Sequence, residues 1–361
     1  MFGSFRFMLA FFVVLTHLIS ISKLGHFAVF GFFVLSGYLI SLAVNQNYGF
    51  GFKSFKNFWI NRVLRLYPAY FVALILTSLI LLGVGEEFST GYNDYFAFPT
   101  AGAGWLQNVT MIYPSWNPHE ISPRMVPPSW ALMVELFYYL LISLGVFRSA
   151  RITNIILAGA ISFHLYGAFY LSYDSIYFGI LPALLPFCIG AQIYNYRERF
   201  VGLYQYLSDN FNYIFSVFIV SIAVFLPTFF YFRNIQGNLF MAERVLKMEF
   251  YFSLIMVALL VAALSVATRS PFGFSKKLEG LLGDWSYPMY LYHMIVGMAV
   301  SYVIWGEPLR GLNYPGIVSF LISMPLLIAL CHANGLMEEP LQRIRKRFRG
   351  VDKSPVASAQ K

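Results

Sequence analysis

The chain has 361 residues, of which 58% are hydrophobic, 19% are aromatic and only 11% are charged. About a quarter of the residues of a soluble domain are charged, so this composition excludes an ordinary soluble protein and indicates that lipid surrounds most of the chain. We expect membrane topology and contact with anionic lipid or phosphate groups to explain the formal charge of +9. We do not expect a nucleic-acid partner.

Apolar runs of about 20 residues, long enough to cross a bilayer as helices, recur along the whole sequence. We predict an all-α integral membrane protein, a polytopic bundle of ten transmembrane helices. The predicted helices cover residues 5–22, 26–44, 66–84, 130–147, 153–170, 177–194, 212–231, 250–268, 285–304 and 314–334. We expect the first helix to be retained, because no small-residue cleavage site follows it and a second span begins almost at once.

Lysine and arginine residues predict the orientation of this bundle, because they accumulate in short cytoplasmic loops. With the N-terminus inside, 19 of the 25 Lys and Arg residues fall in cytoplasmic segments. Both termini are therefore expected in the cytoplasm. The longest external loop, residues 85–129, is too small for a core of its own, and we expect it to form an ordered cap.

The end of the chain has a different composition from the bundle. Residues Arg343 to Arg349 form a basic segment that we interpret as a topology anchor, and Ser354 to Lys361 are expected to be disordered. Cys188 and Cys331 lie in predicted spans without metal-type spacing, so we interpret them as apolar packing residues and expect no metal.

Ionisable residues inside a bilayer are costly and are candidates for function. Among the acidic residues, we expect only Glu135 to lie clearly inside a span. Among the histidines, His17, His164 and His293 lie inside spans, and His332 lies near the end of the last helix.

Arg6 and His17 are eleven positions apart on the first predicted helix. This spacing is about three turns, so the two side chains point from one face, about 16 Å apart along the axis. A neutral imidazole there can act as general base on a hydroxyl, and an arginine at the cytoplasmic mouth can hold an anionic donor. A snorkelling arginine and a packing histidine remain the alternative.

Arg62 and Arg65 share one helical face just before Pro68, at a predicted cytoplasmic membrane edge. Two guanidinium groups in this position suit phosphate, although positive-inside anchoring explains them equally well. Ser36 lies with Gly31 in a helix whose small residues allow close helix contact.

Two later segments carry further polar residues. Glu135 follows Trp130 in the fourth predicted span, about 8 Å below the external surface, where a carboxylate needs a partner. Ser286, Tyr290 and His293 are spaced by four and three residues in the ninth span, so they are expected to face one polar cavity. Structural pairing of Glu135 and core packing of His293 remain alternatives.

Together, and in this order, these segments resemble the acyltransferase 3 family of membrane acyltransferases over nearly the whole chain. The matching motifs are Arg6 with His17, Phe32 to Leu39, Arg62 to Tyr70, Trp130 to Glu135, Ser286 to His293, and Glu338 to Pro340. Two departures concern the subfamily: Phe30 and Gly31 are apolar where many members carry a polar residue, and Asn61 stands where a further arginine is common.

The resemblance implies an O-acyltransferase that moves an acetyl group from cytoplasmic acetyl-CoA to a hydroxyl of an extracytoplasmic or lipid-linked sugar. It implies catalytic roles for His17, Glu135 and His293, and cofactor binding by Arg6, Arg62 and Arg65. Supporting positions are Ser36, Tyr70, Trp130, Ser286 and Tyr290.

We expect residues 1–340 to form the acyltransferase domain and residues 341–361 a basic cytoplasmic tail. The expected location is the bacterial cytoplasmic (inner) membrane, and the expected partners are an acyl-CoA, a glycan or lipid-linked acceptor and membrane lipids. Homo-oligomerisation stays open. The alternative function is a transporter or flippase that uses the same buried His, Glu and Arg residues as a proton or solute relay.

Overall fold

The computed structural model describes residues 2–21 and 23–348, so the predicted disorder of Ser354 to Lys361 lies outside the described residues. Throughout those described residues the secondary structure is helical, without strands. The α-helices are α1 Gly3–Leu18, α2 Leu24–Ala43, α3 Phe52–Val84, α4 Glu86–Tyr92, α5 Gly102–Thr110, α6 Ser129–Ser143, α7 Ala150–Tyr170, α8 Tyr173–Tyr177, α9 Ile180–Asn195, α10 Val201–Asp209, α11 Phe211–Phe230, α12 Leu239–Val266, α13 Lys276–Trp305 and α14 Tyr314–Arg347. Short π- or 3-10 turns are η1 Val44–Tyr48, η2 Pro118–Glu120 and η3 Tyr231–Ile235.

Each predicted apolar segment falls on a helix, but the helices differ in length. In the described part of the chain, seven are long and apolar enough to cross a membrane, namely α2, α3, α7, α11, α12, α13 and α14. Helices α1, α6 and α9 are apolar but have only 16, 15 and 16 residues. The structure therefore supports seven candidate spans, and the count of ten and the inside placement of the termini stay predictions.

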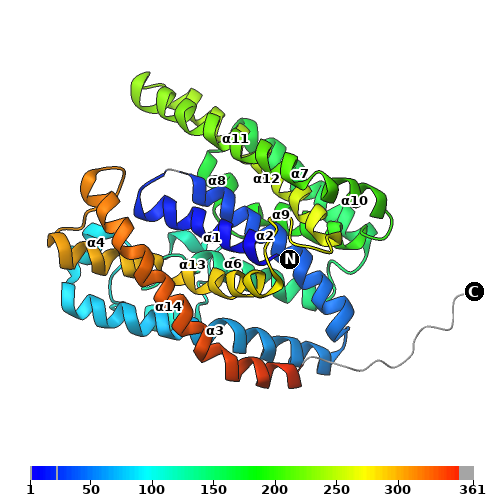
Figure 1. The fold of residues 1–361 in the computed structure, drawn as a ribbon, viewed down its shortest axis with the longest axis horizontal. Coiled ribbons are helices and arrows are strands. Elements are labelled where there is room, and N and C mark those ends of the chain that lie inside the picture. The colour runs from blue at the N-terminus through cyan, green and yellow to red at the C-terminus, as the bar shows by residue number, and fades with distance from the viewer. Residues whose placement is uncertain (1, 22, 349–361) are drawn as a thin grey trace, which may run out of the picture.

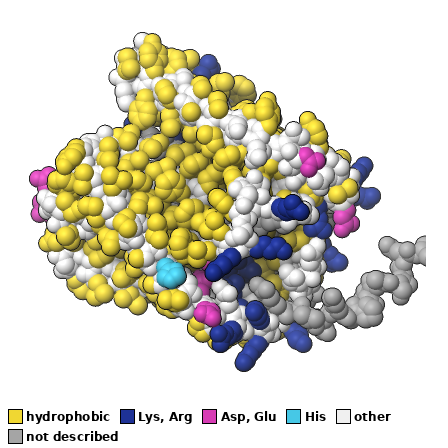
Figure 2. All heavy atoms as spheres, in the orientation of Figure 1, with side chains coloured by type: hydrophobic (Ala, Val, Ile, Leu, Met, Phe, Trp, Pro, Cys, Tyr) yellow, Lys and Arg dark blue, Asp and Glu magenta, His cyan; other side chains and the backbone are white. Residues whose placement is uncertain are grey.

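Helices α1, α2 and α13 form the centre of the bundle, with α11 and α12 on one side and α3 and α14 on the other (Figure 1). In the most apolar window of α2, 78% of the residues are buried, and in that of α13, 72% are buried. The corresponding fractions are 22% for α7 and 28% for α11. Apolar residues on the outer helices therefore face outward, and Figure 2 shows the resulting broad hydrophobic surface.

Close contact between α2 and α9 depends on two glycines. A Cβ atom at Gly190 would overlap the carbonyl oxygen of Val34, and one at Gly37 would overlap that of Phe187. Small residues at such positions let two helix backbones approach, which is how membrane helices gain packing energy without a hydrophobic driving force. The prediction that small residues of α2 serve packing is consistent with this contact.

Several helices continue beyond their apolar parts. Helix α3 begins at Phe52 rather than at residue 66, and α13 begins at Lys276, where the Ser275 side chain accepts a hydrogen bond from the Leu278 amide at 3.2 Å. Helix α14 continues through Pro340 to Arg347. Figure 2 shows that Lys and Arg side chains gather near this end of α14. The first turns of α13 and the last turns of α14 thus extend the bundle at its basic end.

Candidate active site

A narrow cavity of about 80 Å³ lies between α1, α2, α3, α6 and α13. Its lining includes seven of the predicted site residues, which are Arg6, Ser36, Arg62, Arg65, Glu135, Ser286 and Tyr290. These residues come from five helices that are far apart in the sequence. The remainder of the wall is largely apolar and includes Phe32 and Leu39.

Glu135 is the carboxylate of this cavity, and two hydroxyl groups hold it. The Ser36 hydroxyl donates to Glu135 Oε1, and the Tyr139 hydroxyl donates to the same oxygen at 2.5 Å. The sequence analysis missed Tyr139, although its position four residues after Glu135 on the same helix was a signal. Arg6 lies on the same cavity, so the carboxylate has the cationic neighbour that burial of a charge requires.

Arg62 is the most enclosed of the three arginines. It is buried, and its guanidinium carbon lies 5.3 Å from the centre of the Phe58 ring and 6.0 Å from that of Tyr139. Its Nε–H has no hydrogen-bond partner among the described residues. Because an unpaired buried donor is costly, this group fits an anionic ligand that supplies the missing acceptor.

Glu279 fixes the helix that carries Arg6, and the sequence analysis missed this residue. Its carboxylate accepts hydrogen bonds from the backbone amides of Gly3 and Ser4 at 3.0 and 3.2 Å. It also accepts from the hydroxyls of Ser4 and Ser270 at 2.5 and 2.6 Å. A carboxylate at a helix N-terminus pairs with free amides and the positive end of the helix dipole. Glu279 thereby anchors the start of α1 to α13.

His17 and His293 lie together but outside the lining of this cavity. Their ring centres are 5.2 Å apart with planes at 36°. His293 is fully buried, whereas His17 remains partly exposed. His293 Nδ1 lies 2.9 Å from the Tyr290 carbonyl oxygen, which can only accept, so Nδ1 carries the proton. His293 Nε2 then presents a lone pair, and this atom has no partner among the described residues.

Tyr290 connects the cavity with the histidine pair. Its ring lines the cavity and is centred 6.3 Å from that of His293. Its hydroxyl donates to the Pro128 carbonyl at 2.8 Å, which fixes the ring against the start of α6. Ser286, one turn earlier on α13, also lines the cavity. The expectation that Ser286, Tyr290 and His293 face one polar cavity holds for Ser286 and Tyr290 only, because His293 lies beyond the lining and packs against His17.

Tyr70 and Trp130 are not part of the lining of the narrow cavity. The Tyr70 hydroxyl donates to the carbonyl of Asn108 in the long loop at 2.6 Å. Trp130 packs against the rings of His119 and Phe178, with centres 5.5 and 5.2 Å away. Both residues hold the long loop to the bundle rather than line the cavity.

Arg124 organises that loop from its interior. The side chain is 1% exposed, and its Nε and Nη1 donate to the carbonyls of Pro127, Pro118, His119 and Ile121 at 2.8 to 3.0 Å. Its guanidinium group lies 4.0 Å from the centre of the Tyr95 ring. Residues 118–127 thus wrap around one buried cation. The prediction that this loop is an ordered cap agrees with these contacts.

Two ionisable residues inside helices hold other helices together. His164 of α7 bonds the Pro182 carbonyl oxygen through Nε2 at 2.9 Å. Glu249 accepts hydrogen bonds from the hydroxyls of Ser221 and Ser253, each at 3.0 Å. The expectation that only Glu135 lies well inside a span was wrong, because α12 begins at Leu239 and places the buried Glu249 ten residues into the helix.

Comparison with known proteins decides the class of this site. The profile of a family described as an acyltransferase domain matches residues 4–333. The chain belongs to this family, the acyltransferase 3 family. The predicted resemblance is confirmed, and an acyltransferase is favoured over a transporter or flippase. With its seven candidate spans, this acyltransferase is an integral membrane protein.

Two relatives match parts of this acyltransferase. Acyltransferase MdmB of Streptomyces mycarofaciens is 28% identical over 128 residues, which are 35% of this chain and 29% of MdmB. Nodulation protein 10 of Rhizobium leguminosarum bv. viciae is 30% identical over 114 residues, which are 30% of each chain. The matches thus span less than a third of each relative. No solved structure matches this chain.

Proposed function

We propose that this acyltransferase moves an acetyl group from acetyl-CoA to a hydroxyl of an extracytoplasmic or lipid-linked sugar, across the bacterial cytoplasmic membrane. One observation carries the proposal. Helix α1 presents Arg6 to a cavity with two further arginines, and it presents His17 to a second imidazole about 16 Å away along the axis. Anion binding and proton transfer are therefore separated along one helix.

The donor fits this arrangement by its charge and shape. The phosphate groups of acetyl-CoA suit the guanidinium groups of Arg6, Arg62 and Arg65, which form charge-assisted hydrogen bonds with phosphate. The pantetheine arm is thin and extended, which suits the narrow cavity that connects these arginines with Tyr290. The thioester at the tip of the arm would then reach the histidine pair.

The proposed reaction needs one base and one proton. His17 removes the proton of the acceptor hydroxyl as its oxygen attacks the thioester carbonyl carbon. The carbon–sulfur bond then breaks, and the thiolate receives the proton from the His17 imidazolium, so the products are an acetyl ester and coenzyme A. His293 is assigned a positioning role, because its ring packs against that of His17 and its unpartnered Nε2, when neutral, can accept a hydrogen bond from the acceptor. Glu135 is assigned to the donor arm, because it lies on the cavity with Arg6.

An assay in proteoliposomes tests this function. Purified protein is supplied with labelled acetyl-CoA and candidate glycans, beside His17→Ala and the control His332→Ala, whose histidine is exposed about midway along α14. We expect label in the glycan with the wild type and with His332→Ala, and none with His17→Ala. Label transfer that survives His17→Ala would contradict the assigned base. Mass spectrometry of surface glycans from a deletion strain would identify the acceptor by the ester that is lost.

A further inference from the structure

The last turns of α14 are docked against α3 rather than extended into solvent. The Asn61 side-chain amide donates to the Arg345 carbonyl oxygen at 3.0 Å, and Arg345 Nε donates to the Asn61 Oδ1 at 3.2 Å. Asn61 is 1% exposed and Arg345 is 8% exposed. This reciprocal pair fixes part of the basic segment 343–349, which the sequence alone explains as a topology anchor. The segment also lies beyond residue 333, where the family match ends.

The docked end of α14 forms one wall of a second cavity of about 430 Å³. The other walls are the starts of α1 and α13. This outer chamber shares Arg6, Leu39, Arg65 and Tyr287 with the narrow cavity. The two cavities therefore meet at Arg6 and Arg65, and the outer chamber is the larger of the two.

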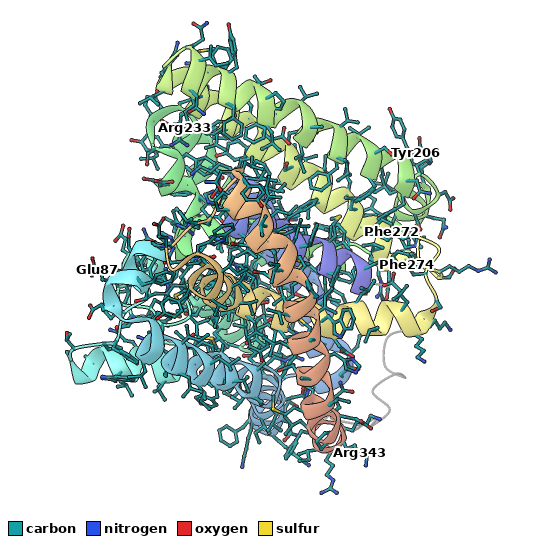
Figure 3. The ribbon with its side chains drawn as sticks, turned by 60° about the vertical axis from the view of Figure 1, so that its left-hand side comes forward. Glu87, Tyr206, Arg233, Phe272, Phe274 and Arg343 are labelled. Carbon is teal, nitrogen blue, oxygen red and sulfur yellow. The ribbon has the colours of Figure 1, made fainter. Side chains whose placement is uncertain are left out.

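One face of α14 supplies polar groups to the outer chamber. Gln342, Arg345 and Lys346, spaced by three and one residues, line it. Arg343 points away from the chamber. It pairs with Glu339 at 3.1 Å, and its side chain is 77% exposed. Figure 3 shows Arg343 at the outer end of α14. The basic segment thus divides into a face that lines the chamber and a face that does not.

The charges of the outer chamber suit an anion that carries several charges. Its cations are Arg6, Arg65, Arg345 and Lys346. Its carboxylates are Glu279, Asp284 and Glu338. Glu279 accepts three hydrogen bonds from the start of α1 and a fourth from Ser270. The four cations outnumber the three carboxylates, so the chamber carries a net positive charge. The combination of arginine forks with a lysine point charge is typical of phosphate recognition.

We propose that the outer chamber binds the phosphorylated nucleotide of the acyl-CoA donor, and that Lys346 and Arg345 of α14 contact its phosphates. The inference rests on the proposed function, since it assumes a coenzyme A donor. The wide chamber holds the nucleotide, and the narrow cavity behind Arg6 and Arg65 holds the arm. The end of α14 is then a specificity element for the nucleotide part of the donor, separate from the residues that act on the acetyl group.

The test compares two neighbouring residues that carry the same charge. Lys346 and Arg347 are adjacent and both exposed, but only Lys346 lines the chamber. Lys346→Gln is expected to raise KM for acetyl-CoA about tenfold with kcat unchanged, because charge-assisted contacts to phosphate are lost. Arg347→Gln is expected to leave KM unchanged. With acetyl-pantetheine, which lacks the nucleotide, Lys346→Gln and the wild type are expected to have equal KM values.

Further measurements distinguish a failure of the proposed function from a failure of this inference. If the wild type neither binds acetyl-CoA nor transfers its acetyl group, both the proposed function and this inference are overturned. If the wild type is active and Lys346→Gln behaves like Arg347→Gln, only the inference is overturned. The same holds if the Lys346→Gln effect appears in nanodiscs with phosphatidylglycerol and disappears in pure phosphatidylcholine, because the chamber then binds an anionic lipid headgroup. The KM of Arg345→Gln for acetyl-CoA is a second test, provided that size-exclusion chromatography shows that this variant folds.

Discussion

The two ends of α1 differ in how they are packed. The arginine end, defined by Arg6, Arg62 and Arg65, borders two neighbouring cavities. At the imidazole end, defined by His17 and His293, the two rings pack against each other and line neither cavity; His293 is fully buried and His17 is partly exposed. Guanidinium groups need water or an anion, so that end stays open, whereas a neutral imidazole pair tolerates a dry environment. Under the proposed function, the donor binds at the arginine end and its acetyl group reacts at the imidazole end.

The sharpest test of this division changes the imidazole end alone. His293→Gln removes the ring beside His17, and we expect kcat to fall about 100-fold, within the range of general acid–base effects, with KM for acetyl-CoA unchanged. Steady-state kinetics with labelled acetyl-CoA measure both constants. A rise in KM with unchanged kcat would place His293 in donor binding and remove the distinction between the two ends.

The complementary change concerns the arginine end. Arg62→Met removes the buried guanidinium group whose Nε–H lacks a partner, and we expect KM for acetyl-CoA to rise about 30-fold, because a hydrogen bond to a charged group contributes about 1.5–3 kcal/mol. Equilibrium binding of acetyl-CoA gives the same ratio. Arg151→Met, at an exposed arginine of α7, is the control and should bind as the wild type does. Equal affinities for all three proteins would contradict a donor site at this end.

A third change loosens the loop that wraps around Arg124. Arg124→Met leaves four carbonyl groups without their common donor, and we expect the apparent Tm in detergent to fall by about 5 °C, as loss of buried charge-assisted hydrogen bonds predicts. Arg233→Met removes an exposed arginine at the end of η3 and should leave Tm unchanged. Identical melting of the two variants would show that Arg124 does not hold the loop.

The smallest expected effect is a pH dependence of the same loop. Burial lowers the pKa of His119 to about 3, below its ordinary value of about 6.5, so the folded loop keeps this residue neutral. The unfolded chain then binds the proton first, and the contribution of His119 to stability, complete above about pH 6.5, is lost as the pH falls toward 3. We expect Tm of His119→Phe to fall less steeply than that of the wild type between pH 7 and pH 4.5. Parallel curves would contradict a buried neutral His119.

Much of the fold could be predicted because the apolar segments mark the helices directly. Hydropathy locates the apolar part of a helix but not its polar continuation. The predicted span therefore begins at residue 66 although α3 begins at Phe52, and the basic end of α14 was interpreted as a tail. Glu249 was missed for the same reason. The predicted apolar span begins at residue 250, whereas α12 begins at Leu239 and includes Glu249.

The candidate site was predictable where one helix carries the information. The spacing of Arg6 and His17 and that of Ser286, Tyr290 and His293 follow from helix geometry. Contacts between helices do not follow from a local pattern. Neither the capping of α1 by Glu279 nor the pairing of Asn61 with Arg345, which is 284 positions away, could be predicted from the sequence.

The most direct test of the account is the sidedness of the reaction. Acetyl-CoA does not cross a bilayer, so proteoliposomes with a known orientation of the C-terminus can receive donor on one side and a membrane-impermeant glycan on the other. The account predicts label in the glycan when acetyl-CoA is on the side that carries the end of α14, where Arg6 and Arg65 line the outer chamber. Transfer that requires acetyl-CoA on the opposite side would contradict donor binding at the arginine end.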